Sequence, residues 1–181
     1  VFFGSSADNK IYALDAGSGT IRWEFFTGGP VRIAPSLWKK KLYAGSDDGY
    51  VCCLEAETGK ELWRFRAAPA PKKILGNGRL ISLWPVRTGI AIEDGVAYFG
   101  AGVFPAEGTC LFALDAATGK LLWKNIDYGK GGLGTVSPQG YIMVSDEKLF
   151  IPSGRTMPAA FSKKTGDFLF HRNFNWRGIG L

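Results

Sequence analysis

The stretch ALDAGSGTIRW at residues 13–23 decides the fold, because this 181-residue chain repeats it three more times. The copies are CLEAETGKELW (53–63), ALDAATGKLLW (113–123) and a degenerate AFSKKTGDFLF (160–170). Successive copies lie 40, 60 and 47 residues apart, measured between the glycines of the TG or SG pair. A repeat of roughly 40–50 residues indicates an array of similar supersecondary units. This periodicity is a stronger guide to the fold than the secondary-structure propensity of any single segment.

Each copy is the end of a longer unit. One apolar run precedes every copy, at residues 1–4, 42–45, 97–100 and 149–152, and another lies further upstream in three of them, at 33–38, 88–92 and 141–144. Turn-forming residues separate these runs, as expected for short strands joined by hairpins. Each unit therefore predicts four antiparallel strands, and the first unit lacks its first strand.

The residue types of the phrase suit a strand, a turn and a second strand. Asp15 and Asp115 can accept hydrogen bonds from turn amides, and the glycines supply a left-handed backbone conformation. The closing tryptophan offers a large flat surface that can pack on a neighbouring unit. The residues to which this structural role is assigned are Asp15, Gly19, Trp23, Gly59, Trp63, Asp115, Gly119, Trp123 and Gly166.

Composition agrees with an all-β protein. The chain has 25 glycines and 14% aromatic residues, and no run of about 18 apolar residues that would predict a transmembrane segment. Because residues 1–4 already resemble a strand, we expect this chain to begin inside a larger protein, without a leader. The net charge of +6 includes short lysine clusters, which fit solvated turns or a basic rim for an anionic partner. No nucleic-acid-binding signature accompanies them, so no nucleic-acid partner is expected.

The phrase Ala-x-Asp-x-x-Thr-Gly-x-x-x-Trp resembles the tryptophan-docking motif of the pyrroloquinoline-quinone (PQQ) repeat. The resemblance covers nearly all of residues 1–173. It implies an all-β propeller segment of about four blades, at about 1–26, 31–66, 86–126 and 140–173, within one partial domain, 1–181. Full rings of this family have seven or eight blades, so the remaining blades are the first expected partner.

The resemblance leaves several functions open. One branch of the family contains quinoprotein dehydrogenases that use PQQ and calcium to oxidise an alcohol or sugar. Another contains propellers that bind no quinone, such as the outer-membrane-protein assembly scaffold lipoprotein. We favour a non-catalytic binding or scaffold module with no assigned cofactor, which the resemblance places in the periplasm or among exported proteins. A dehydrogenase fragment is the alternative, and a saccharide-binding module is a third interpretation.

Candidate ligand-binding residues lie at or near two kinds of connection in the last two units. In a propeller, the connections between blades and the loops between second and third strands open on one face, where ligands usually bind. Arginine, tryptophan and amide side chains there could hold an anionic ligand, or could instead bond backbone carbonyls and stiffen the loops. The candidates are Trp84, Arg87, Ser137, Gln139 and Arg155, to which Trp176 and Arg177 are possible additions.

Other reactive residues favour structural roles. Adjacent cysteines are bridged beside the quinone in some relatives, but Cys52-Cys53 lies inside a predicted strand, where neighbours point to opposite faces. Cys110 also lies in a strand, and the single histidine, His171, has no second histidine to help build a catalytic or metal site. Asp47-Asp48-Gly49 is interpreted as a tight turn, since calcium needs six to eight oxygen ligands. We therefore expect no catalytic residue and no metal site.

Overall fold

The computed structural model describes residues 1–126, 136–154 and 156–171, and it confirms the predicted all-β fold. Apart from one short 3-10 helix, η1 (Pro105–Glu107), the described elements are strands. None of these residues forms a helix long and apolar enough to cross a membrane. The strands are β1 (Phe2–Gly4), β2 (Lys10–Leu14), β3 (Ile21–Phe26), β4 (Ser36–Trp38), β5 (Lys41–Gly45), β6 (Tyr50–Glu55), β7 (Glu61–Arg66), β8 (Lys73–Gly76), β9 (Arg79–Ser82), β10 (Ala91–Glu93), β11 (Val96–Ala101), β12 (Cys110–Asp115), β13 (Leu121–Asn125), β14 (Met143–Val144), β15 (Lys148–Ser153), β16 (Thr156–Ser162) and β17 (Phe168–Phe170).

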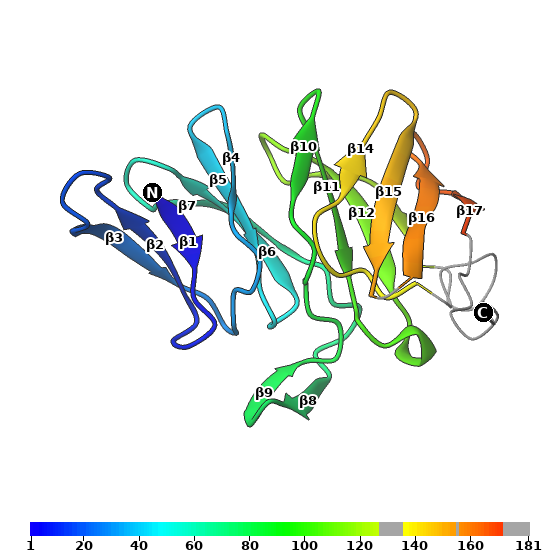
Figure 1. Cartoon of the computed structure of the whole chain (residues 1–181), viewed down its shortest axis with the longest axis horizontal. Helices are drawn as coiled ribbons and strands as arrows, with labels where there is room; N and C mark the ends of the chain where they lie inside the picture. Colours follow the sequence, from blue (N-terminus) through cyan, green and yellow to red (C-terminus); the bar gives the residue numbers. More distant parts are fainter. Residues whose placement is uncertain (127–135, 155, 172–181) are drawn as a thin grey trace, which may run out of the picture.

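Apart from β8 and β9, which pair with each other, the strands form four antiparallel sheets, which we call blades 1 to 4. Blade 1 has the order β1-β2-β3, and blades 2 to 4 have the orders β4-β5-β6-β7, β10-β11-β12-β13 and β14-β15-β16-β17. Blade 1 thus has three strands, as its sequence predicts. The first strands converge, since β10 contacts both β4 and β14, and the sheets fan outward from them (Figure 1). We call these first strands the inner strands, and we call the last strands of the blades, β3, β7, β13 and β17, the outer strands.

The core lies between successive blades. The third strands carry apolar residues at nearly every position because both of their faces are covered. One cluster joins blades 2 and 3 around Tyr43, Phe99 and Phe112, and a second joins blades 3 and 4 around Leu111 and Phe161. Each blade therefore obtains much of its burial from its neighbour, as in other repeat proteins.

The repeated phrase forms the turn between the third and fourth strands. In blade 3, Asp115 Oδ1 accepts hydrogen bonds from the Thr118 hydroxyl at 2.6 Å and the Thr118 amide at 2.8 Å. These two bonds lower the pKa of the Asp115 carboxyl group below its usual value. Gly119 has a φ of 75°, which side chains other than hydrogen strongly disfavour. Asp15 and Gly19 form the same arrangement in blade 1.

Each closing tryptophan contacts the turn of the next blade. The indole Nε1 of Trp23 donates to Ala56 O at 3.1 Å, that of Trp63 to Ala116 O at 3.2 Å, and that of Trp123 to Lys163 O at 3.1 Å. The rings lie directly on the turn glycines. An added Cβ would come within 2.7 Å of Trp23 at Gly59, 2.7 Å of Trp63 at Gly119 and 2.5 Å of Trp123 at Gly166, whereas at Gly19 it would meet nothing within 4 Å.

We expect Trp63→Phe to lower the free energy of unfolding by about 1 kcal/mol, because phenylalanine keeps most of the packing but removes one of the two donors to Ala116 O, leaving only the Tyr43 hydroxyl at 2.9 Å. Urea denaturation of the full-length protein measures the change. Tyr12→Phe is the control, since it removes only an exposed hydroxyl bond to Asp8 and should change stability by less than about 0.5 kcal/mol. Equal effects of the two substitutions would contradict the role of the indole bond.

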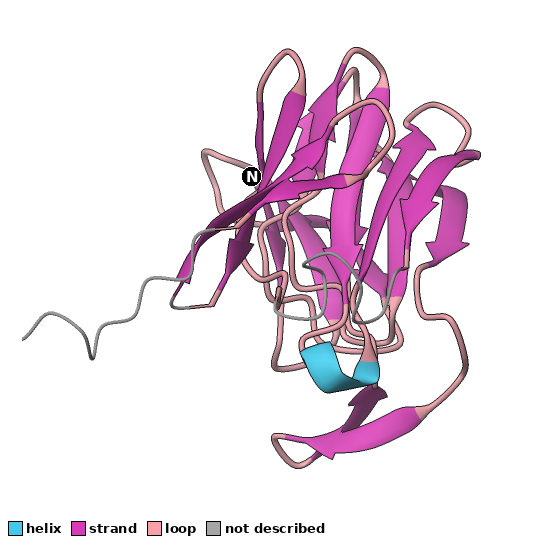
Figure 2. Cartoon of the chain, turned by 90° about the vertical axis from the view of Figure 1, so that its right-hand side faces the viewer, coloured by secondary structure: helices cyan, strands magenta, loops and turns pink. Residues whose placement is uncertain are grey.

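The connection between blades 2 and 3 contains a hairpin that the sequence analysis treated only as a long connection. Strands β8 and β9 are joined by Asn77 and Gly78, whose φ values of 51° and 74° fit a two-residue hairpin turn. Arg79 ties this hairpin to blade 1 by donating to Ala7 O at 2.5 Å. The hairpin and η1 lie at the same end of the blades, which we call the loop face (Figures 1 and 2).

Candidate functional site

Three residues occupy equivalent positions on the loop face. Arg32, Arg87 and Gln139 each lie four residues before an inner strand, namely β4, β10 and β14. The residue before each packs against a glycine of the preceding blade, at or next to the end of β1, β5 or β11. The pairs are Val31–Gly4, Val86–Gly45 and Pro138–Gly100. The inner strands converge, so these three positions lie close to one end of the line on which the strands converge. We call this end the channel mouth.

Asp47 links two of these positions. Its side chain is fully buried and accepts a hydrogen bond from Arg32 Nε to Oδ2 at 2.6 Å. Arg87 binds it in a bidentate manner, with Nε 2.9 Å from Oδ1 and Nη2 3.0 Å from Oδ2. The Asp47 backbone also joins both connections, because its amide donates to Pro30 O and its carbonyl accepts from Ser82 N.

The charges of this group do not balance. Two guanidinium groups converge on one carboxylate, and the Arg32 and Arg87 side chains stay 28% and 20% exposed. A buried carboxylate without such donors would carry a large desolvation penalty, so the pair of arginines stabilises Asp47. The group nevertheless keeps one excess positive charge at the channel mouth, where an acceptor anion could complement it.

The sequence predicts a ligand-binding role for Arg87 and only a tight turn for Asp47. Asp48, the neighbouring residue, does hold the turn by accepting from the Tyr50 amide at 3.0 Å. Arginine recurs at equivalent positions of consecutive units, 32 and 87. This recurrence was the signal in the sequence that a carboxylate such as Asp47 lies between them. The equivalence of the two arginines can be inferred only when Val31 and Val86, the residues before them, are aligned with each other.

The remaining candidates bond mainly to the protein. Trp84 is 8% exposed, and its indole Nε1 donates to Glu107 O at 3.0 Å beneath η1. The Ser137 hydroxyl donates to Val103 O at 2.7 Å and accepts from Gln139 Nε2 at 2.9 Å. Trp84 and Ser137 thus brace the loops, whereas Gln139 is exposed beside them. Arg155, Trp176 and Arg177 lie outside the described residues.

Cys52 and Cys53 are both buried and unbridged in β6. Burial raises the pKa of Cys52 to about 12 and that of Cys53 to about 11, so both thiols remain protonated at neutral pH. His171 makes a contact of 2.9 Å between Nε2 and Met157 O.

We expect Cys52 and Cys53 to react with a thiol reagent at least about a hundredfold more slowly in the native protein than in urea, because a buried, protonated thiol is a poor nucleophile. The time course of labelling, resolved by peptide mass spectrometry, measures both rates. Rapid labelling of Cys52 or Cys53 in the folded protein would contradict their burial in β6.

The described residues do not fit a calcium-dependent quinone site. Within residues 1–126, 136–154 and 156–171, no three His, Cys, Asp or Glu side chains form a group that could hold a metal ion. Asp47, the most buried carboxylate at the mouth, is already bound by two arginines. The vicinal cysteines lie inside a strand, away from the loop face. No reaction step is therefore derived through PQQ or calcium.

Known proteins share this architecture. A family model described as outer membrane protein assembly factor BamB matches residues 7–176. The solved structure of BamB from Moraxella catarrhalis superposes with a TM-score of 0.67 at 19% identity, covering 96% of this chain and 46% of that one. Quinohemoprotein alcohol dehydrogenase from Comamonas testosteroni gives a TM-score of 0.73 at 17% identity, covering 95% and 33%.

Polyvinylalcohol dehydrogenase from a Sphingopyxis species is 30% identical over 135 residues, which are 67% of this chain and 20% of that protein. The chain thus spans about a fifth of this relative's length. The likeness to the two solved structures establishes the fold, and the family match extends over nearly the whole sequence. The chain belongs to the family of PQQ-like β-propeller repeat proteins.

Proposed function

We propose that this chain is part of a larger propeller that acts as a binding or scaffold module, whose channel mouth recognises an anionic group of a protein or small ligand. The observation that carries the proposal is the pairing of two arginines with the single buried carboxylate of Asp47. Charge-assisted bonds from the excess guanidinium donors suit a carboxylate or a similar oxyanion.

Arg32, Arg87 and Gln139 would contact the ligand in this proposal, and Trp84 and Ser137 would hold the loops that position them. The family description, which names outer membrane protein assembly, supports an exported protein with a protein partner. Other blades of the ring would contribute to any central site.

A PQQ-dependent dehydrogenase that oxidises an alcohol is the second candidate function. The observation that favours it is the 30% identity to polyvinylalcohol dehydrogenase over 135 residues. In that case the calcium ligands and the base would come from parts of the ring outside the described residues.

One experiment separates the two functions. The full-length protein is titrated with PQQ, with and without calcium, while quinone absorbance and dye reduction are followed in the presence of ethanol or polyvinyl alcohol. We expect no calcium-dependent change in absorbance and no alcohol-dependent dye reduction. Saturable, calcium-dependent binding together with dye reduction would overturn the proposal and establish the dehydrogenase.

A further inference from the structure

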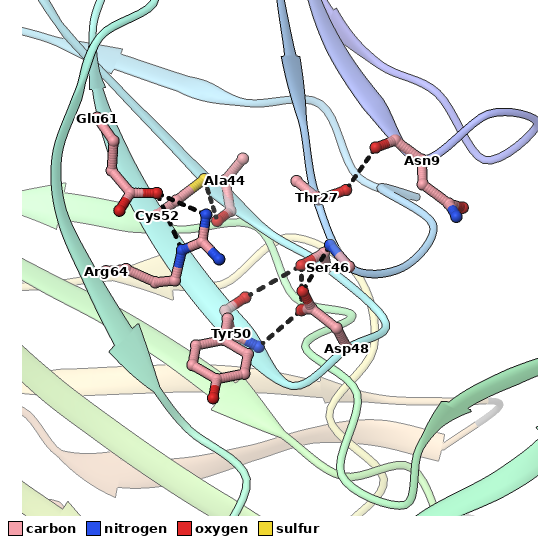
Figure 3. A network of polar contacts seen from close by, with 10 residues as sticks. Asn9, Thr27, Ala44, Ser46, Asp48, Tyr50, Cys52, Glu61 and Arg64 are labelled. Carbon is pink, nitrogen blue, oxygen red and sulfur yellow. Dashed lines mark hydrogen bonds and ion pairs between the residues drawn. The ribbon is translucent and has the colours of Figure 1, made fainter.

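A second polar cavity lies away from the channel mouth, on the outer side of blade 2. It has a volume of about 340 Å³ and is bounded by the outer strand β7 and by the segment that leads into the β8–β9 hairpin. We call it the rim cleft. The residues that matter for its chemistry are Asp48, Arg64, Arg66, Lys72, Lys73 and Ser82. Figure 3 shows Arg64 bonded to Glu61, and Asp48 bonded to the Tyr50 amide.

Four of these side chains are cations and only one, Asp48, is an anion. The Asp48 carboxylate is committed to its own turn, since it accepts from the Gly28 amide at 2.8 Å, the Tyr50 amide at 3.0 Å and the Ser46 hydroxyl (Figure 3). In the part of the chain that the structure describes, Asp48 forms no ion pair. Its oxygens are therefore already satisfied, and its charge is the only negative one that lines the cleft.

The cations differ in how far they are compensated. Arg64 pairs with Glu61 at 2.6 Å. Arg66 donates instead to two neutral carbonyls, Ala68 O at 3.1 Å and Pro69 O at 3.3 Å, which fix its guanidinium group without cancelling its charge. Such a held arginine loses little further entropy when it binds an anion.

The two lysines are the least compensated. Lys72 is 62% exposed and lies 3.8 Å from Glu107, a distance at which an exposed pair contributes little. Lys73 has no ion-pair partner among the residues described here. Both belong to the hairpin segment, so this insertion supplies half of the cleft's positive charge.

Ser82 adds a directional donor at the bottom of the cleft. It is 4% exposed, and its Oγ accepts the Trp84 amide at 3.1 Å. That bond uses a lone pair and leaves the hydroxyl hydrogen to be donated to another acceptor. Ser82 and Arg66 line the same cavity, so a buried hydroxyl donor and a fixed guanidinium group are both available to an oxyanion there.

We propose that the rim cleft binds a small dianion through its oxygen atoms, independently of the channel mouth. The cleft presents N–H and O–H donors and excess positive charge, so its complement is an acceptor-rich anion. Its volume is near the lower end for ligand sites, which favours a small molecule over a segment of a macromolecule. Phosphoryl and dicarboxylate compounds share this chemistry.

The test uses isothermal titration calorimetry of the full-length protein at low ionic strength, with pyrophosphate and succinate as separate probes. Lys72→Gln/Lys73→Gln removes two charges from the cleft. Lys39→Gln/Lys40→Gln removes two charges from the β4–β5 turn, at the end of the blades away from the loop face, and is the matched control. We expect at least one probe to bind, about tenfold more weakly to the cleft variant and within about twofold to the control.

The relative affinities of the two probes distinguish a phosphoryl from a dicarboxylate ligand. If the probe bound equally weakly to both variants, the loss of affinity would come from the general surface charge, and the proposal would be overturned. Saturable binding of a glutamate-rich peptide but of neither small probe would also overturn it, in favour of a protein ligand. Because the substituted lysines are exposed and lie outside the channel mouth, a failure here leaves the PQQ experiment unaffected.

Discussion

Asp47→Ala is expected to lower the free energy of unfolding by about 3 kcal/mol, because it leaves Arg32 and Arg87 facing one another without their shared carboxylate. Losing one partner of a buried ion pair has the largest effect when the remaining charge cannot reach water. The arginines are 28% and 20% exposed, which places the expected value at the lower end of the range for buried pairs.

Urea denaturation of the full-length protein measures this change, with Asp146→Asn as the control. Asp146 is exposed in a turn of blade 4, and its substitution should alter stability by less than about 0.5 kcal/mol. If Asp47→Ala changed the free energy of unfolding as little as the control does, the two guanidinium groups would be hydrated without any rearrangement. That result would also remove the argument for an excess charge held in place at the channel mouth.

Gly119→Ala is expected to destabilise the protein by about 3 kcal/mol, through two separate effects. A methyl group at φ 75° strains the backbone, and the new Cβ would lie 2.7 Å from the Trp63 ring. The ring cannot move away without breaking its 3.2 Å bond to Ala116 O.

The chain contains its own control for this substitution. Gly19 has nearly the same φ, 72°, but nothing lies within 4 Å of the position that a Cβ would take. Gly19→Ala should therefore show the backbone strain alone, about 1 kcal/mol. Differential scanning calorimetry of both variants would isolate the contact with the tryptophan, and equal losses would contradict it.

The fold was largely predictable because its information is local and repeated. Alternating apolar runs, turn glycines and terminal tryptophans recur in each unit, so a single weak copy such as 160–170 could be assigned from the stronger ones. The β8–β9 hairpin was missed although Asn77-Gly78 is a strong hairpin signal.

The candidate site was less predictable because its contacts are not local. Asp47 binds Arg32 and Arg87, which lie 15 and 40 residues away on two different connections. Nothing in the turn Asp47-Asp48-Gly49 indicates which aspartate faces inward. The same limit applies to the rim cleft, where Arg66 of β7 and Lys73 of β8 line the same cavity.

The forward contact of each tryptophan has a consequence for protein synthesis. Trp23 precedes the glycine it covers, Gly59, by 36 residues, whereas Trp63 precedes Gly119 by 56. At about 5–20 residues per second, Trp23 waits roughly 2–7 s for its partner to be translated and Trp63 roughly 3–11 s. The longer connection between blades 2 and 3, together with the loop between β11 and β12, therefore prolongs the period in which nascent blade 2 exposes its tryptophan.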